Sequence, residues 1–509
     1  QAFWIARRIV TAPPWKPPAW MMAAHSTSGS YAEASSAREK RCAPLNTCRL
    51  SPLLVCVCCC LLATVLLVGC TAKDSSGDLE DKPEEPDQME TNVSTRQWTM
   101  LGNTGVAETL ENVGSNESRQ WLIQYPDSWS TDKLGKLGQS SPGEIKWRGD
   151  GKNGVSALVY KGTKSELRQF LEQHSGALFA EEDEVVQAIG LRGAERRLEE
   201  QRFSNSRLWG LDRIDDEVGL DRSYNNFGIT GESAHVYVLD TGIRTTHSEF
   251  EGRAIPEVDL TVFPARRCKG DRTCAFDVNG HGTHCAGTIA GKTVGVAKKA
   301  LVHAVKVLGD DGSGSNAGII AAINFVAAEG QRPAVISMSL GCARPCQSRS
   351  EAIAIEAANR AGVTVVVAAG NNGRTARPDA CAYAPANIPQ AITVGSITIN
   401  SDRRSSFSNV GSCVDIFAPG SLIFSASPSS DSSFTTLSGT SMACPHVSGV
   451  AALVLSLSPN LNPDEIAKRI LGGAQTGKVQ DARGSPNKLL FMGNLADAAP
   501  TPAPTPAPT

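Results

Sequence analysis

The stretch Ser438-Gly-Thr-Ser-Met-Ala-Cys-Pro-His-Val-Ser-Gly449 is followed directly by an apolar run, Val450 to Leu457. Small residues and glycines precede a proline, and apolar residues then follow at helical density, which predicts a tight turn leading into a buried helix. Pro445 suits the first turn of that helix, where backbone N–H groups have no helical partner. Ser441 would lie among these N–H groups, which suits a nucleophile whose oxyanion needs donors. Serine is equally common as a plain helix N-cap, so this stretch alone leaves both roles open.

Three further stretches accompany it in a fixed order along the chain. His235-Val-Tyr-Val-Leu-Asp240 is a β-rich run that ends in an aspartate. In Asn279-Gly-His281-Gly-Thr-His284, glycines flank a histidine at the predicted start of a helix. Val363-Thr-Val-Val-Val-Ala-Ala-Gly370-Asn371 is a buried strand that opens into a polar turn. Asp, His and Ser in this order match the catalytic triad of subtilisin, not that of chymotrypsin.

Together the four motifs resemble those of the subtilisin-like serine proteases (subtilases). The resemblance runs from about Leu208 to Leu490. It implies that Ser441 is the nucleophile, that His281 is its general base and that Asp240 orients His281. It also implies that the side-chain amide of Asn371 and the N–H of Ser441 form the oxyanion hole, where one donor lowers the barrier by about 3 kcal/mol.

A zinc site is the alternative role for His281 and His284. Their i, i+3 spacing could direct both rings at one metal ion, but no third ligand or general-base glutamate accompanies them as in HExxH. The resemblance assigns the first histidine to catalysis and the second to local packing or hydrogen bonding. We therefore expect no catalytic cofactor.

The resemblance also implies the walls of a peptide-binding cleft, in which the substrate adds as an extra strand. One edge would be Gly312, Ser313 and Gly314, the other Ser339, Leu340 and Gly341, and the S1 pocket would be lined by Ala368, Ala369 and Gly370. These residues are small and uncharged, so we expect apolar or aromatic P1 side chains. These segments contain no acidic residue, so they do not indicate a protease that cleaves after basic residues.

Two stretches, Arg403-Arg-Ser-Ser-Phe-Ser-Asn409 and Val414-Asp-Ile-Phe-Ala-Pro-Gly420, resemble the proteinase K branch of the family. A structural calcium site of that branch would use the main-chain oxygens of Pro389 and Ala391 and the carboxylate of Asp415. Ca²⁺ favours such oxygen ligands. Asp415 could equally be an ordinary surface carboxylate.

The 15 cysteines fall into two groups, seven before residue 71 and eight after residue 267. Disulfides are expected because the protein is expected to be exported. Cys381 with Cys413 resembles a pairing in bacterial members of the branch. Two local bridges without family counterparts are also expected, Cys268–Cys274 and Cys342–Cys346. Cys285, usually a free buried thiol in this branch, and Cys444, in place of the usual Thr, are left unassigned.

The segment from 205 to 495 is the expected catalytic domain, because apolar strand-like runs alternate there with Ala-rich helical ones. This alternation predicts an α/β fold, a parallel sheet flanked by helices. The expected strands are 236–239, 301–307, 334–339, 363–368 and 391–394, and the expected helices are 282–291, 315–329, 349–361, 441–457 and 463–472.

Residues 118–200, which precede the expected catalytic domain, are predicted to form a small α+β unit. Its position resembles that of the family's inhibitory (I9-type) propeptide. An unrelated small domain is the alternative. Autocleavage is expected within about Leu198 to Ser204, before the segment that looks like the family's mature N-terminus. Arg196-Arg197 could instead serve a basic-residue convertase acting in trans.

Residues 53–70 are an uncharged apolar segment with basic residues before it and acidic residues after it. This asymmetry predicts export of the residues on the C-terminal side of the segment. A signal peptide, a signal anchor that tethers the protein to a membrane, and a lipobox ending at Cys70 all remain open. Residues 1–52 would be a leader, cytoplasmic segment or signal n-region. Residues 71–117 would be a disordered acidic spacer and residues 496–509 a Pro-rich tail.

The chain has 509 residues and a formal net charge of -3, so it exceeds one compact domain and has no charge excess for a nucleic-acid partner. We predict a secreted or membrane-tethered serine endopeptidase, made as an autoprocessed zymogen and acting as a monomer. Its partners would be protein or peptide substrates and its own propeptide. The alternative is a catalytically silent binding protein on the same fold with a retained propeptide, which the intact set of four site residues disfavours.

Overall fold

The structure, a computed structural model, describes residues 117–126, 128–137, 144–148, 156–190, 207–262, 264–399 and 401–498. The predicted leader, the apolar segment and nearly all of the acidic spacer and the tail lie outside these ranges. So do the expected cleavage interval, Leu198 to Ser204, and the dibasic Arg196-Arg197.

The N-terminal unit of the described chain is a four-stranded antiparallel sheet in the order β2-β3-β1-β4. Its elements are β1 Arg119–Gln124, α2 Thr131–Lys136, β2 Glu144–Arg148, β3 Ala157–Gly162, α3 Lys164–Gln173 and β4 Phe179–Glu182. Thr163 and Glu166 form a capping box that fixes the start of α3.

The larger domain is built on a ten-stranded sheet in the order β18-β19-β15-β14-β13-β11-β6-β9-β7-β8. These strands are β6 His235–Asp240, β7 Ala254–Asp259, β8 Arg266–Arg267, β9 Leu301–Lys306, β11 Ala334–Met338, β13 Val363–Ala368, β14 Ile392–Ile397, β15 Ile416–Pro419, β18 Gln475–Thr476 and β19 Lys488–Leu489. All pairs from β19 to β7 are parallel, and β8 and β18 add antiparallel edges. The predicted α/β fold is confirmed, although β7, β8, β15, β18 and β19 were not expected.

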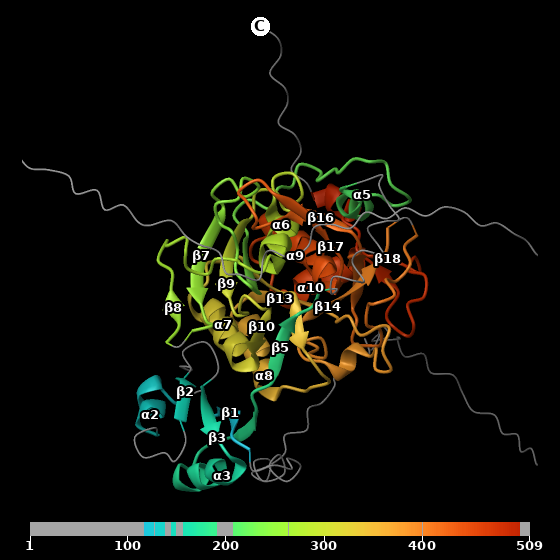
Figure 1. Ribbon diagram of the computed structural model, residues 1–509. Coiled ribbons are helices and arrows are strands. Elements are labelled where there is room, and N and C mark those ends of the chain that lie inside the picture. Colours follow the sequence, from blue (N-terminus) through green and yellow to red (C-terminus); the bar gives the residue numbers. More distant parts are fainter. Residues whose placement is uncertain are drawn as a thin grey trace, which may run out of the picture. The chain divides into compact units, whose positions relative to one another are not determined.

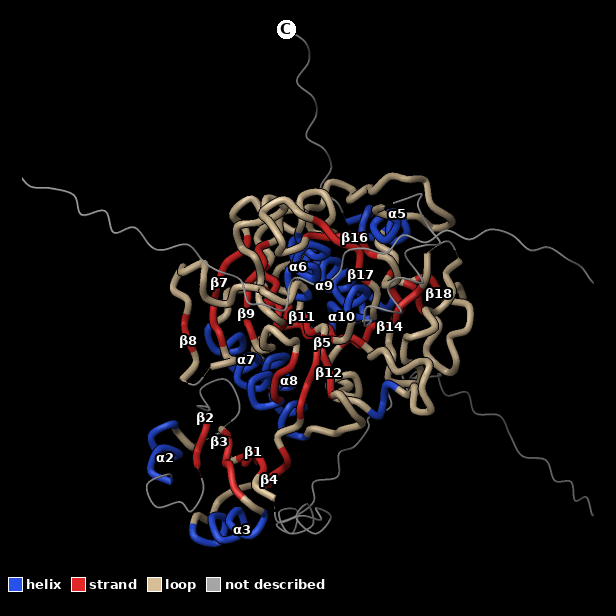
Figure 2. Tube along the Cα trace, in the orientation of Figure 1, coloured by secondary structure: helices blue, strands red, loops and turns tan. Residues whose placement is uncertain are grey.

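Helices cover both faces of this sheet (Figures 1 and 2). They are α5 Trp209–Asp215, α6 His281–Ala290, α7 Asn316–Glu329, α8 Arg349–Arg360, α9 Thr440–Leu457 and α10 Pro463–Gly473. Residues of α6, α9 and α10 share one hydrophobic cluster, and those of α7 and α8 share another. The five helices predicted from the sequence begin and end within one residue of those observed.

Strand β6 shows why the strands are apolar on both sides. Val236 and Val238 belong to the cluster under α6 and α9, whereas Tyr237 and Leu239 belong to the cluster under α7 and α8. Both faces are therefore buried, and the strand reads as a continuous apolar run. The carboxyl ends of β6 and β13 then deliver polar residues to one edge of the sheet, where open α/β sheets place their sites.

Helix α9 is long and apolar enough to span a membrane, the one such helix among the residues that the structure describes. It is 89% buried inside the domain, between α6 and the sheet. We therefore assign it as the central core helix of the domain.

Three short elements form a separate sheet at the site edge: β10 Ser313–Ser315, β5 Val185–Ala188 and β12 Leu340–Cys342, with β5 in the middle. Both pairings are antiparallel. A two-stranded hairpin, β16 Ile423–Ala426 and β17 Phe434–Leu437, completes the sheets. The chain segment after the N-terminal unit thus runs as a strand between two edges of the larger domain.

The described residues form three disulfides, Cys268–Cys274, Cys342–Cys346 and Cys381–Cys413. These are the pairs expected from the sequence. Among the described cysteines, Cys285 and Cys444 are free and buried.

Candidate active site

Asp240 and His281 meet where the end of β6 faces the start of α6. Gly280, with φ of 106°, turns the chain into the helix, a conformation that favours glycine. Gly282 lets the first turn approach β6, because a Cβ there would lie 2.2 Å from the carbonyl oxygen of Gly242. His281 Nδ1 consequently lies 2.8 Å from Oδ1 and 2.9 Å from Oδ2 of Asp240.

Burial and charge act in opposite directions on the pKa of His281. Burial disfavours the imidazolium ion, but the attraction of Asp240 outweighs it and raises the pKa well above its ordinary value. In the neutral ring the proton lies on Nδ1, toward Asp240, so Nε2 carries the lone pair. Nε2 has no hydrogen-bond partner among the described residues. It is therefore open to accept a proton.

Ser441 is the second residue of α9 and is fully buried. Its Oγ donates to the carbonyl oxygen of Ser339 at 3.0 Å and to the carbonyl oxygen of Ile189. A hydrogen bond from Oγ to Nε2 of His281, which would accompany a general-base role of that ring, is not among these contacts. In this arrangement the hydroxyl is directed at two carbonyl oxygens instead.

Asn371 follows β13 and is held by the first residue of α9. Its Oδ1 accepts from Thr440 N–H at 2.9 Å and from Thr440 Oγ1 at 3.0 Å. This orients the amide nitrogen, and Nδ2 donates to the carbonyl oxygen of Ile189 at 3.2 Å. One carbonyl oxygen is thus bonded by both Asn371 and Ser441.

Strand β5 occupies the predicted cleft. Gly314 pairs with Val186 on one side and Gly341 with Gln187 on the other. Beyond the strand, the N–H of Ile189 donates to Ser339 O at 3.2 Å. The predicted edges, Gly312 to Gly314 and Ser339 to Gly341, therefore both contact this segment.

A pocket of about 140 Å³ lies beside Ile189. Ala368, Ala369 and Gly370, the predicted S1 residues, line it together with Asn371. The structure therefore brings these four predicted residues together at one pocket.

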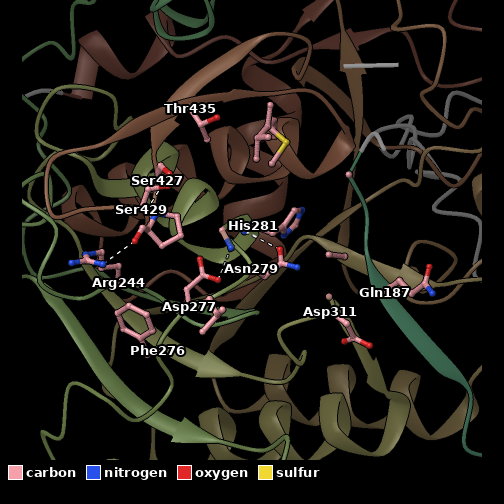
Figure 3. A pocket seen from close by; sticks show the side chains of 18 of the residues that line it. Gln187, Arg244, Phe276, Asp277, Asn279, His281, Asp311, Ser427, Ser429 and Thr435 are labelled. Atoms are coloured by element: carbon pink, nitrogen blue, oxygen red, sulfur yellow. Dashed lines mark hydrogen bonds between the residues drawn. The ribbon is translucent and has the colours of Figure 1, made fainter. Parts of the chain in front are cut away.

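A larger pocket of about 720 Å³ extends past His281 on the side of Gly190 (Figure 3). Its far wall includes Arg244, whose Nε lies 2.6 Å from Oδ1 of Asp431. This wall was not predicted from the sequence, because Asp431 lies in a serine-rich loop that carries no motif.

His284 is turned away from the site. Its Nε2 lies 2.9 Å from Ile423 O, and burial lowers its pKa to about 3. The possible ligand atoms grouped with His281 belong to Asp240 and Cys285, not to His284. The zinc alternative therefore lacks its second histidine.

The predicted calcium ligands are two main-chain oxygens and one carboxylate, the ligand type that Ca²⁺ prefers. Asp415 Oδ2 accepts from Thr393 N–H at 2.8 Å, and Asp415 N–H donates to Thr393 O at 2.9 Å. These bonds place the carboxylate against the segment that contains Pro389 and Ala391.

A second acidic group, missed from the sequence, comprises Asp212, Asp216 and Asp221. Each residue offers one carboxylate oxygen that could bind a metal ion, and these oxygens lie within 4.8 Å of one another. Asp212 and Asp216 already accept backbone N–H groups of residues 221 and 222. These carboxylates are spaced along a helix and the loop after it, and this spacing matches no metal-binding motif that could be recognised in the sequence.

A family model described as the subtilase family matches residues 231–492. The chain belongs to the subtilase family. This subtilase is 47% identical to alkaline serine exoprotease A of Vibrio alginolyticus over 293 residues, 57% of the chain and 51% of that relative. It is 44% identical to an extracellular serine proteinase of Thermus sp. (strain Rt41A) over 323 residues, 63% of the chain and 72% of the relative.

A solved structure is similar as well. The crystal structure of a cold adapted subtilisin-like serine proteinase matches this subtilase with a TM-score of 0.51 and 45% identity, covering 57% of this chain and 98% of the other. The predictions of a subtilase and of a serine endopeptidase are confirmed.

Proposed function

We propose that this subtilase is secreted and hydrolyses peptide bonds in proteins through Asp240, His281 and Ser441, with Asn371 as an oxyanion donor. The observation that carries the proposal is the carbonyl oxygen of Ile189, which Asn371 Nδ2 and Ser441 Oγ both contact. A substrate carbonyl in that place would lie beside the nucleophile and a donor at once. Secretion is supported by the name of the Thermus relative, an extracellular serine proteinase.

In this mechanism Ser441 Oγ attacks the carbonyl carbon while Nε2 of His281 takes the hydroxyl proton. Asp240, at 2.8 Å from Nδ1, stabilises the imidazolium ion that forms. The negative oxygen of the tetrahedral intermediate accepts hydrogen bonds from Asn371 Nδ2 and Ser441 N–H. His281 then returns the proton to the leaving amine, and water hydrolyses the acyl-enzyme by the same steps in reverse.

The N-terminal unit and β5 together act as an inhibitory propeptide in this proposal. Strand β5 lies in the cleft as an added strand, with Ile189 at the P1 position and Gly190 at P1′. Self-cleavage would therefore break the Ile189–Gly190 bond. This replaces the interval Leu198 to Ser204 expected from the sequence, an expectation that took no account of the position of Val185–Ala188 in the cleft.

Two carboxylates at and just after the end of β4, Glu181 and Asp183, bind the N-terminal ends of helices in the larger domain. Glu181 accepts from Ser348 Oγ at 2.9 Å and from two N–H groups at the start of α8. Asp183 accepts from Ala317 N–H at 2.8 Å at the start of α7. Carboxylates at helix N-termini are favourable, because they satisfy free N–H groups and face the positive end of the dipole.

The small pocket beside Ile189 supports apolar or aromatic P1 side chains, since Ala368, Ala369 and Gly370 offer no charge. Calcium bound by Pro389, Ala391 and Asp415 would stabilise the fold without entering the reaction. A monomer that is released, or is tethered through residues 53–70, is consistent with this mechanism.

Mass spectrometry tests the function. Residues 71–509 are incubated with calcium, as the parent sequence and as Ser441→Ala. A new N-terminus at Gly190 in the parent alone is the expected result. If both chains remain intact, the silent binding protein is favoured, and if both are cut alike, another protease is responsible.

A further inference from the structure

Asp277 is a fully buried carboxylate next to the site, and the mechanism above gives it no role. Its Oδ1 accepts from Gly280 N–H at 2.8 Å and from Thr241 Oγ1 at 2.9 Å. Its Oδ2 accepts from Thr283 N–H at 2.8 Å and from Thr283 Oγ1 at 2.6 Å. A buried charge is costly unless its oxygens are bonded in this way. Figure 3 shows Asp277 below His281, on the wall of the large pocket.

Thr241 connects this carboxylate to the Asp240–His281 pair. Because its hydroxyl hydrogen is directed at Asp277, its oxygen is free to accept, and it does so from Gly282 N–H at 2.9 Å. The N–H of Thr241 donates to Oδ1 of Asp240 at 2.7 Å. That same oxygen lies 2.8 Å from His281 Nδ1. Thr241 therefore forms hydrogen bonds both with Gly282, the residue after His281, and with the carboxylate of Asp240.

We infer that Asp277 and Thr241 are positioning residues: they fix the end of β6 against the start of α6 and so hold Asp240 at bonding distance from His281. Asp277 holds the turn before α6 through Gly280 and Thr283, and it sets the direction of the Thr241 hydroxyl. Thr241 in turn restrains Asp240 through its N–H and the start of α6, next to His281, through its hydroxyl oxygen. The inference rests on the catalytic roles proposed for Asp240 and His281. It matters for rate because a misplacement of about 1 Å can reduce turnover on the order of 10²-fold.

The test removes one hydroxyl. Thr241→Val keeps the shape of the side chain but can neither donate to Asp277 nor accept from Gly282. Thr241→Ser keeps the hydroxyl. Thr364→Val is the matched control, since Thr364 is a buried threonine on β13 whose Oγ1 has no partner among the described residues. Active sites are counted with an acylating inhibitor, and kcat and KM are measured across pH on a peptide substrate.

We expect Thr241→Val to lower kcat by about 10- to 100-fold with KM changed by less than about twofold. The acid limb of its pH profile should shift to lower pH, because a looser Asp240 stabilises the imidazolium less. Thr241→Ser should restore most of the activity, and Thr364→Val should leave both kcat and the profile unchanged. A purely structural role would reduce the number of active sites without moving the profile.

The inference is overturned if Thr241→Val behaves like Thr364→Val, or if Thr241→Ser loses as much as Thr241→Val. Where Thr241→Val matures too slowly to assay, the titration of His281 is followed by NMR in a Ser441→Ala background. A lower pKa of His281 in the Thr241→Val chain supports the inference, and an unchanged pKa overturns it. Failure of the proposed function looks different, since the parent protein would then show no hydrolysis that depends on Ser441.

Discussion

The side-chain amide of Asn371 donates a hydrogen bond of 3.2 Å to the main-chain carbonyl oxygen of Ile189, a residue 182 positions earlier in the chain. Asn371 is directed there by Thr440, the residue before Ser441, the proposed nucleophile. The donor is thus fixed by the same helix start that carries Ser441. It does not have to move when charge develops on a substrate carbonyl.

Replacing Asn371 with Leu should therefore lower kcat by about 10²- to 10³-fold and leave KM nearly unchanged, because the donor acts mainly on the transition state. Steady-state kinetics on a peptide substrate measure both constants. A loss confined to KM would contradict the assigned role.

Ile189→Glu should block self-cleavage at the Ile189–Gly190 bond, since the pocket beside Ile189 is lined by Ala368, Ala369 and Gly370 and has no cationic side chain in its lining to pair with a carboxylate. The matched control is Leu198→Glu, an equivalent change in the interval expected from the sequence. Intact-mass measurement of both chains decides between the two sites. If Leu198→Glu is the variant that stays uncut, the cleavage site lies in the later interval.

Release of the cleaved N-terminal segment should become faster as pH rises. Burial raises the pKa of Asp183 to about 6, and it raises the pKa of Glu351 to about 8 with a further contribution from the charge of Glu181. Separation exposes Asp183 to water and takes the charge of Glu181 away from Glu351, so both carboxyl groups bind their protons less tightly once the segment has left. The affinity is greatest at low pH and is lost as pH rises through about 6 and then about 8.

The time course of protease activity after self-cleavage, recorded from pH 5 to about 9, measures this release. Glu351→Gln stays neutral, so it should slow release at the alkaline end. Glu356→Gln, an exposed residue on the same helix that pairs with Arg360, serves as the control and should not alter the pH dependence. Release that slows as pH rises would overturn the prediction.

The kcat/KM of the mature enzyme should rise with pH through the raised pKa of His281, because the general base must be neutral. Removal of β5 exposes the ring and removes the effect of burial, which opposes the raised pKa, so the direction is unchanged. Asp240→Asn should reduce kcat by roughly 10³- to 10⁴-fold. It should also move the acid limb to lower pH. A profile centred at the ordinary histidine value in the parent would contradict the assigned pairing.

The disulfides should differ in their contribution to stability. Cys381 and Cys413 are separated by 32 positions and Cys342 and Cys346 by 4. In the chain-entropy account, their removal as Cys→Ser pairs costs about 4 and about 2 kcal/mol of unfolding free energy. Denaturant unfolding of both pairs in a Ser441→Ala background, which prevents self-digestion, gives the comparison. Equal losses would show that loop length does not govern the effect.

The sequence alone predicted the parts of the site that lie within contiguous motifs. Asp240 ends a strand, and His281 and Ser441 lie at the starts of helices whose apolar pattern is clear, so their relative places follow from the fold. The five predicted helices were correct to within a residue for the same reason. Strands such as β15 and those of the hairpin β16–β17 have only four residues each, and no periodicity of that length separates them from loops.

The pairing of β5 with β10 and β12 could not be predicted from the sequence. Val185-Val-Gln-Ala-Ile189 reads as a strand in any context, and only the folded chain shows that its partners are β10 and β12 of the other domain. Asp277 was missed for a related reason. Its partners Thr241 and Thr283 are ordinary threonines that become informative only when the end of β6 meets the start of α6.

Strand β5 belongs to the same molecule as the cleft that it fills, so in the proposed activation self-cleavage and release of the segment follow different rate laws. The proposed first cut is unimolecular, so its half-time would be the same in a dilute and in a concentrated sample. Once the bond is broken, the segment can leave and rebind as a separate molecule, and free enzyme accumulates only where the total concentration falls toward the dissociation constant. Cutting can therefore be complete inside a crowded compartment while proteolysis begins only after dilution outside it.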